Sequence, residues 1–378
     1  MSALFSSLTI RGVTVKNRIA VSPMSQYRAK DGHANQWHMV HLGRFALGGA
    51  GLVFAEATAV EPDGRRTHGD LGLWSDAHIT ELSPICAFLE AEGALPGIQL
   101  GHAGRKASER RPWHGETPVD EEDLELRGEA PWTAIAPSAV PYADGWPTPN
   151  EMTDADIERV ITAFASASRR AVEAGFKFIE IYAAHGFLVH QFLSPIANTR
   201  VDKWGATPEG RRRFAVEVAG AIRKAIPDTV PLSFRLSATD WVDGGVEVED
   251  TIETAKALKA AGVDMIDCST GGIGGRQRPQ RMKLGQGFQV PFAEQIKQAA
   301  DMQTMAVGFL WDAKVCEDVI SSGQADMVAL ARELLLDPNW PNRVSAELGA
   351  DSDHSLWPPE AGWWLMKRER LCEKLGLR

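Results

Sequence analysis

Polar and small residues recur at one kind of place in this sequence, directly after short apolar runs with the composition of β-strands. In chain order, the eight run ends are Pro23-Met24-Ser25, Ala57-Thr58, Gln99, Tyr182 with His185, Arg235, Ser269-Thr270-Gly271-Gly272, Val307-Gly308 and Ala331-Arg332. One buried Gln or Arg alone is as common in a packed core as in an active site. Their coincidence at eight ends therefore carries the prediction of a functional site.

The loops after the last runs have the chemistry of a phosphate site. They contain Gly271, Gly308 and Ala331, and they end in Arg332. Backbone N–H groups together with one guanidinium suit a phosphate dianion, so a phosphorylated ligand is predicted. The glycine-rich stretch 271–275 does not fit G-x-G-x-x-G, and we interpret it as a loop rather than a dinucleotide fingerprint.

Other partners are disfavoured by charge and spacing. His38 and His41 lie three positions apart on an expected helix, but no third ligand has suitable spacing, so no metal is predicted. A net charge of −10 argues against nucleic acid and anionic membranes as partners. The four cysteines form no C-x-x-C, which favours free thiols in a reducing compartment.

The strand ends must be brought together by a regular frame. Strands are expected at 18–22, 51–57, 95–100, 177–183, 230–236, 263–268, 303–307 and 325–330, with helices at 37–47, 76–92, 153–174, 209–225, 248–260, 292–300 and 313–321. Eight such alternations predict a parallel α/β fold that closes as a (β/α)8 TIM barrel. An open, doubly wound sheet is the structural alternative.

The length fits one decorated barrel better than two domains. A barrel core takes about 250 residues, and the excess lies in an insertion after strand three, 102–152, and a C-terminal extension, 338–378. The insertion is a candidate lid over the mouth. No secretory signal is recognisable at the N-terminus and no apolar run approaches the length of a membrane span, so a cytoplasmic location is expected.

In sequence order, a set of short motifs resembles the Old Yellow Enzyme family of FMN-dependent oxidoreductases, in the branch of xenobiotic reductases and thermophilic-like ene-reductases. The motifs are Lys16-Asn17-Arg18, Pro23-Met24, residues 56–60, residues 99–106, His185-Gly186, residues 191–195, Asn198, Arg200, Asp202, Gly205, Val307-Gly308 and Arg332-Glu333-Leu334.

The resemblance implies FMN at the barrel mouth and NADPH or NADH as reductant. Pro23, Met24 and Ser25 would flank the flavin, Ala57 and Gln99 would contact its ring, and Gly271, Val307, Gly308, Ala331 and Arg332 would line its phosphate end. Arg235 would place positive charge near N1 and the C2 carbonyl. Nicotinamide and substrate would use the same flavin face in turn, which gives ping-pong kinetics.

The resemblance also assigns the substrate side of the site. Tyr182 and His185 would hold a carbonyl or nitro oxygen, on which negative charge grows as hydride reaches the β-carbon. Three residues apart on a helical turn, they can point the same way. Phe187, Lys106 and Trp364 are further substrate-pocket candidates.

Four positions depart from the family pattern. Ser25 replaces a usual cysteine, Tyr182 a usual histidine, Phe187 a proton-donating tyrosine and Ala331 a usual glycine. Because Phe187 has no hydroxyl, the proton must come from Tyr182, Tyr27 or water.

Four functions remain open at this point. The leading hypothesis is reduction of an electron-poor alkene or similar small molecule by NAD(P)H through FMN. Tyr182 and Phe187 also suggest an FMN dehydrogenase or demethylase that works oxidatively. A flavin-free barrel lyase, with Lys106 or Lys177 as candidate Schiff-base residue, and a non-catalytic flavin-binding protein complete the set.

The C-terminal extension is rich in tryptophan and arginine. It contains Trp340, Trp357, Trp363 and Trp364, followed by Arg368 and Arg370. Related enzymes often lend such side chains to a neighbouring subunit. We therefore expect a homodimer or homotetramer in which Trp364, with Arg368 or Arg370, lies near the neighbour's active site; a self-packed cap is the alternative.

Overall fold

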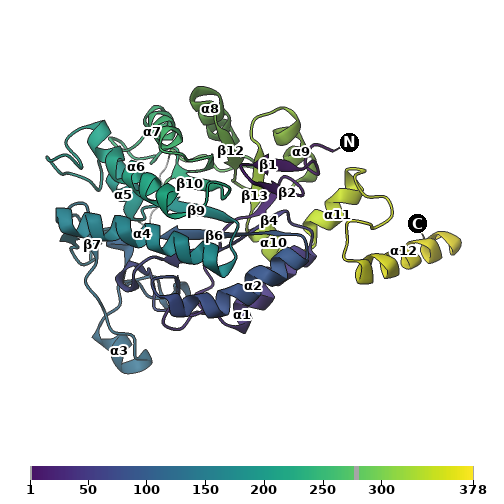
Figure 1. Ribbon diagram of the computed structural model, residues 1–378, viewed down its shortest axis with the longest axis horizontal. Coiled ribbons are helices and arrows are strands. Elements are labelled where there is room, and N and C mark those ends of the chain that lie inside the picture. The colour runs from purple at the N-terminus through teal and green to yellow at the C-terminus, as the bar shows by residue number, and fades with distance from the viewer. Residues whose placement is uncertain (1, 276–280, 378) are drawn as a thin grey trace.

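The strands of this protein close into a single parallel barrel, seen in a computed structural model that describes residues 2–275 and 281–377 (Figure 1). Its eight strands are β3 (Ile19–Val21), β4 (Leu52–Ala59), β6 (Leu95–Gly101), β9 (Phe178–Ala183), β10 (Leu232–Ser237), β11 (Met265–Ser269), β12 (Gln303–Ala306) and β13 (Met327–Leu330). Each pairs in parallel with its neighbours, and β13 pairs with β3 to complete the circle. The predicted (β/α)8 barrel is confirmed, and the open-sheet alternative is wrong.

Helices follow the strands and surround the barrel. They are α1 (Gln36–Leu47), α2 (Ile79–Ala91), α4 (Asp154–Ala174), α6 (Pro208–Ala225), α7 (Val248–Ala260), α8 (Val290–Ala300), α9 (Ala313–Ser321) and the short α10 (Arg332–Leu336). Thr153 caps α4 and forms a capping box with Asp156, as its sequence predicts. The expected helix 76–92 instead begins as a 3-10 turn, Asp76–His78, before α2.

The barrel interior has an apolar end and a polar end. Near the amino ends of the strands, Phe54, Phe178, Met265, Met305 and Met327 form one buried cluster. The N-terminal hairpin of β1 (Leu8–Ile10) and β2 (Val13–Val15) adds apolar side chains to that cluster. Because side chains alternate along a strand, the inward face continues toward the mouth with Glu180 and Tyr182 on β9 and with Asp267 and Ser269 on β11.

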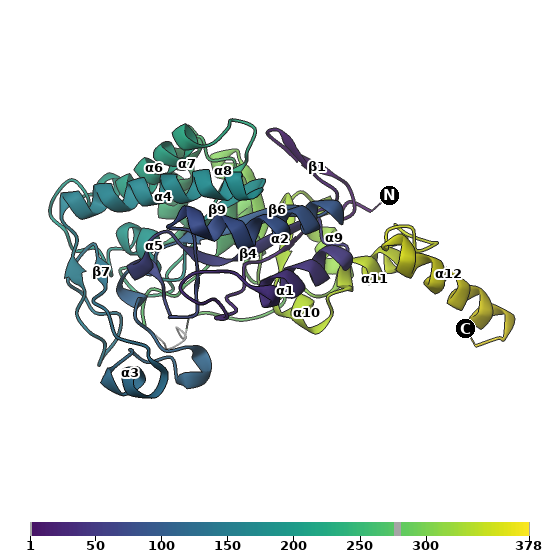
Figure 2. The ribbon, with the colours of Figure 1, turned by 60° about the horizontal axis from the view of Figure 1, so that its bottom comes forward.

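The insertion after β6 contains α3 (Glu121–Arg127) and the short strands β7 (Ile135–Ala136) and β8 (Asn150–Glu151). Its α3 protrudes from the barrel body in both ribbon views (Figures 1 and 2). Tyr142 Oη donates a hydrogen bond to Gly275 O at 3.0 Å, and Arg105 Nη2 donates one to Ile273 O at 2.8 Å. The segment is thus tied to the loop after β11, while its role as a lid stays a prediction.

The C-terminal extension has an anchored part and a free part. Trp340, at the start of α11 (Trp340–Glu347), is buried and donates from Nε1 to Trp311 O at 2.9 Å. In contrast, α12 (Pro359–Lys374) projects away from the barrel (Figure 2) and buries only Gly362 among its residues. A self-packed cap therefore describes α11 but not α12. Across the described ranges, no helix is long and apolar enough to cross a membrane.

Candidate active site

A cavity of about 660 Å³ opens at the carboxyl ends of β10 to β13 and β3. Five residues predicted from the sequence line it: Arg235, Val307, Gly308, Ala331 and Arg332. Its wall also contains Ser22, Ser269, Gln289 and Phe309, none of which is predicted from the sequence to contact a ligand. The catalytic face of a TIM barrel is this same end, so the cavity is the candidate binding site.

At one side of the cavity the groups match a phosphate. The Arg332 guanidinium lies over the Phe309 ring, 4.8 Å from its centroid, and makes no hydrogen bond or ion pair within the described chain. Gly308 has φ +113°, and a Cβ there would lie 3.0 Å from Gln289 Nε2. Gly271 does not line the cavity; its amide donates to Thr239 O, and its carbonyl accepts from Ser237 Oγ. It therefore shapes the neighbouring loop.

On the barrel axis, Arg235 is buried and only partly satisfied. Its Nη1 donates to Ser22 Oγ at 2.6 Å and lies 3.4 Å from Asp267 Oδ2, whereas its Nε has no partner within the described chain. An unsatisfied buried donor is costly unless a ligand completes it. Together with Arg332, it gives the cavity two cationic groups, and their charge fits an anionic ligand such as FMN.

The remaining predicted flavin contacts lie on β4 and β6 and directly after β3. Gln99 is buried on β6, in register with Ala57 of β4, and donates from Nε2 to Glu180 Oε1 at 2.9 Å. Pro23, Met24 and Ser25 follow β3 and are partly exposed at the mouth. All five residues thus lie toward the carboxyl ends of β3, β4 and β6, the end of the barrel at which the cavity opens.

Tyr182 and His185 are in direct contact. Tyr182 Oη lies 2.9 Å from His185 Nδ1, and His185 Nε2 lies 2.5 Å from Ser269 Oγ. Burial raises the pKa of Tyr182, while burial and then the charge of Arg235 hold the pKa of His185 well below its usual value. The imidazole is therefore neutral at pH 7 and links two hydroxyl groups.

The expected helical turn between these two residues is wrong. Tyr182 belongs to β9, and His185 follows in a loop with φ +53°, a left-handed conformation rare for a non-glycine residue. Its amide donates to Ser237 Oγ at 3.0 Å, which fixes this turn. Backbone strain of this kind is typical of functional sites.

Three further candidates surround the pair. Phe187 stacks on the Tyr182 ring with centroids 4.0 Å apart. Lys106 Nζ donates to His185 O at 3.0 Å, and burial, followed by the charge of Arg66, lowers the pKa of Lys106 to about 7. Tyr27 Oη accepts from Arg66 Nη1 at 3.2 Å, and burial raises the pKa of Tyr27 to about 12.

Not every candidate converges on this site. Trp364 lies on the projecting α12 and is 67% exposed. His38 accepts from the Asn35 amide at the start of α1, and its Nε2 lies 3.3 Å from Glu56 Oε1. The two helix histidines thus pack within the fold, and the described residues contain no cluster of three or more metal-binding side chains.

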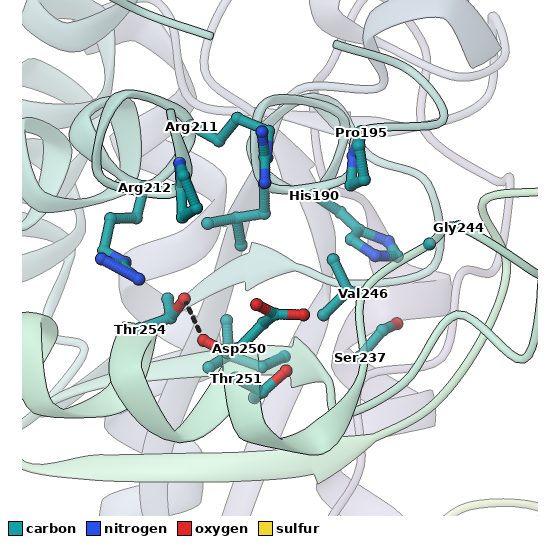
Figure 3. A pocket seen from close by; sticks show the side chains of 14 residues that line it. His190, Pro195, Arg211, Arg212, Ser237, Gly244, Val246, Asp250, Thr251 and Thr254 are labelled. Carbon is teal, nitrogen blue, oxygen red and sulfur yellow. Dashed lines mark hydrogen bonds between the residues drawn. The ribbon is translucent and has the colours of Figure 1, made fainter. Parts of the chain in front are cut away.

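A second cavity, of about 240 Å³, lies outside the barrel and is lined by residues of α6, α7 and the loop 244–246 (Figure 3). His190 and Ser237 form part of its wall. His190 accepts from the Gly186 amide at 2.9 Å and lies 2.8 Å from Asp240 Oδ1, so it supports the loop that carries His185. Neither Tyr182 nor Arg235 lines this cavity.

Comparison with known proteins places these features in a family. Residues 3–351 match the model of the NADH:flavin oxidoreductase / NADH oxidase family. The chain is 43% identical over 362 residues to an NADPH dehydrogenase of Geobacillus sp. (strain WCH70), covering 95% of this chain and 98% of that protein. It is 40% identical to an NADPH dehydrogenase of Bacillus subtilis (strain 168), covering 95% and 99%.

Solved structures agree in fold. A 2-naphthoyl-CoA reductase matches with TM-score 0.82 and 26% identity, covering 91% of this chain and 52% of that one. A histamine dehydrogenase from Rhizobium sp. 4-9 matches with TM-score 0.75 and 25% identity, covering 91% and 48%. This chain thus spans about half of those two proteins. An old yellow enzyme homologue from Zymomonas mobilis, at TM-score 0.74 and 23% identity, is covered over 97% of its length and 94% of this chain.

Proposed function

Because the chain belongs to the NADH:flavin oxidoreductase / NADH oxidase family, we propose that it is an FMN enzyme whose acceptor is an alkene conjugated to a carbonyl or nitro group. FMN in such a site supplies the hydride, which it takes from NADPH or NADH. The observation that carries the proposal is the mouth cavity, which places two incompletely paired guanidinium groups near a hydroxyl–imidazole–hydroxyl chain. The family decides against the flavin-free lyase.

We assign the cofactor contacts as follows. Arg332, Gly308 and Ala331, with Val307 beside them, hold the phosphate; Arg235 provides positive charge at the ring; and the remaining contacts come from Pro23, Met24, Ser25, Ala57 and Gln99. A fixed positive charge favours the anionic, reduced form of the ring over the neutral, oxidised form.

On the substrate side, we assign Tyr182 as the group that touches the substrate oxygen and His185 as a positioning residue. Ser269 Oγ lies closer to His185 Nε2, at 2.5 Å, than to Gln289 Oε1, at 3.5 Å. Donation from Ser269 to Nε2 leaves the imidazole proton on Nδ1, where it donates to Tyr182 Oη. The phenolic hydrogen of Tyr182 is then free to be donated to the substrate oxygen, on which negative charge grows as hydride reaches the β-carbon.

The test begins with the purified holoprotein. It should carry FMN, lose its flavin absorbance when NADPH is added without oxygen, and regain that absorbance when a cyclic enone or nitroalkene follows. Bleaching without recovery by any such acceptor would contradict the substrate class. A folded protein that neither contains nor binds FMN would contradict the cofactor assignment as well.

A second candidate, oxidative dehydrogenation, is favoured by two features of the site. Tyr182 contacts His185, and Phe187 offers no hydroxyl for α-protonation. The histamine dehydrogenase among the structural neighbours shares the fold with this chain. An amine that bleaches the oxidised flavin anaerobically, with no nicotinamide present, would favour this function over the first.

We further propose that α12 docks on a second copy of the chain, forming a homodimer or homotetramer. Trp364, Leu371 and Leu375 are 67%, 56% and 59% exposed and are spaced to share one helix face. Arg368 and Arg370 lie between them on the same helix. An exposed apolar stripe on a helix that leaves the body is typical of an interface.

The pair of changes Trp364→Glu and Leu371→Glu is expected to weaken association about 30-fold or more, because a buried interface tryptophan is typically worth about 2 kcal/mol or more. Sedimentation equilibrium should show the mass falling toward that of the monomer. As control, Val201→Glu changes a side chain that is 92% exposed on the barrel and should leave the mass unchanged. A wild-type protein that sediments only as monomer would exclude a shared site.

We also propose a cytoplasmic location and small molecules as the only ligands. The four cysteines, Cys86, Cys268, Cys316 and Cys372, are free thiols. Free thiols and nicotinamide reductants both fit a reducing compartment.

A further inference from the structure

Two carboxyl groups lie inside the barrel, beneath the mouth cavity. Glu180 of β9 and Asp267 of β11 are both fully buried, on either side of β10. Strand pairing sets Glu180 level with Ser233, and it sets Asp267 level with Arg235. Buried acids are rare unless they are paired or protonated, so this cluster needs a physical account.

The hydrogen bonds of the two acids are unequal. Glu180 accepts from Gln99 Nε2 at 2.9 Å and from Ser233 Oγ at 3.3 Å. Neither oxygen of Asp267 accepts a hydrogen bond from a nitrogen or hydroxyl donor of the described chain, although Arg235 Nη1 lies 3.4 Å away. Both oxygens of Asp267 are thus buried without a hydrogen-bond partner in the described residues, an environment that favours the protonated carboxyl group.

The net charge of the cluster also favours one proton held between the two acids. One guanidinium faces two acids, so two ionised carboxylates would leave an uncompensated negative charge in the barrel core. With a single shared proton, the three groups are neutral together. Burial and the neighbouring acid raise the pKa of Glu180, and burial raises that of Asp267, so proton retention at pH 7 is favoured.

We propose that Glu180 and Asp267 share one proton and act as an electrostatic positioning pair for Arg235, so that the charge of the pair tunes the reduction potential of bound FMN. This inference rests on the proposed function, in which Arg235 faces the flavin. One shared proton leaves one negative charge beside Arg235. Loss of that proton adds a second negative charge and makes the anionic, reduced ring less stable.

Few other charged or titratable groups surround the pair. Arg235 comes from β10, Tyr182 from the next inward position of β9, and Cys268 follows Asp267 on β11. The groups facing it from β6 and β10, Gln99 and Ser233, do not titrate. Arg66 acts on Tyr182 from outside the barrel. Tyr182 and Cys268 have pKa values raised by burial, so the carboxyl pair is the first of these groups to lose a proton as the pH rises.

The test uses holoprotein variants Glu180→Gln, Asp267→Asn and the double variant, with the midpoint potential measured against pH by dye equilibration. Each single variant keeps one negative charge, so the ratio of affinities for reduced and oxidised FMN should stay within about threefold of wild type at pH 7. The double variant removes that charge and should raise the ratio about tenfold or more, which is about 30 mV for a two-electron couple. At alkaline pH, the wild-type potential should fall more steeply than that of either single variant.

Several outcomes would overturn the proposal. If each single variant raises the potential about half as far as the double variant, both acids are ionised and no proton is shared. If the double variant leaves the potential unchanged, or the alkaline slopes do not differ, the pair does not act on the flavin. The alkaline pH dependence of the midpoint potential in the single variants tests the proposal even if the double variant does not fold.

Two controls separate this inference from the function beneath it. Asp123→Asn removes a buried carboxylate of the insertion and should leave the potential unchanged. Arg235→Met should lower the potential because it removes the positive charge at the ring. If Arg235→Met leaves the potential unchanged, the assignment of Arg235 to FMN fails. If Arg235→Met changes the potential but the variants of Glu180 and Asp267 do not, only the proposal about the acid pair is overturned.

Discussion

The Tyr182→Phe enzyme is expected to transfer hydride and proton to an enone 10²–10⁴-fold more slowly than wild type, the typical contribution of a general acid. The rate at which NADPH reduces its flavin should stay within about threefold of the wild-type rate, because that half-reaction needs no proton from Tyr182. Stopped-flow absorbance at the flavin band measures the two halves separately. The phenyl ring keeps the stacking on Phe187 at 4.0 Å, so the change removes a hydroxyl and little packing.

A matched variant moves the hydroxyl to the neighbouring ring. In the family that this chain resembles, the proton-donating tyrosine stands where Phe187 stands here. The double variant Tyr182→Phe/Phe187→Tyr should therefore recover part of the lost rate, whereas Phe187→Leu in the same background should not. An unchanged oxidative half-reaction in Tyr182→Phe would show that the proton comes from elsewhere, with Tyr27 or water as source.

Much of the barrel could be predicted from the sequence because its signals are local. The α4 helix has its cap at Thr153 and a buried face that includes Phe164 and Ala171, and both are visible as spacing along the chain. Strand limits were less predictable: β10 begins at Leu232 rather than 230, since Pro231 precedes the strand ladder. The order of the strands followed from the rule that parallel neighbours are joined through a helix.

The site was only partly predictable, because its contacts are distant in sequence. Tyr182 and His185 could be singled out, but Ser269, which completes the hydrogen-bonded chain, is 84 positions away from His185. Glu180 carries a readable signal, since it shares the inward face of β9 with Tyr182, two positions on. The partner of Glu180 could not be read, because the pairing of β9 to β11 through β10 depends on the closed sheet.

Arg332→Ala should weaken FMN binding about 10- to 100-fold, because a hydrogen bond to a charged group contributes about 1.5–3 kcal/mol. Arg332 is suited to this role because its guanidinium is held over Phe309 and has no ion-pair partner within the described chain. A free, planar donor fork can therefore bind phosphate without first breaking an internal contact. Flavin fluorescence during titration of the apoprotein measures the dissociation constant.

Riboflavin is the control ligand, because it has the same ring and no phosphate. Its affinity should be nearly equal for wild type and Arg332→Ala, so the loss appears as a collapse of the FMN-to-riboflavin ratio. Arg332→Lys keeps the charge but loses the bidentate fork. Its FMN-to-riboflavin affinity ratio should therefore lie between those of wild type and Arg332→Ala. Equal losses for both flavins would mean that Arg332 shapes the cavity through Phe309 and does not bind the phosphate.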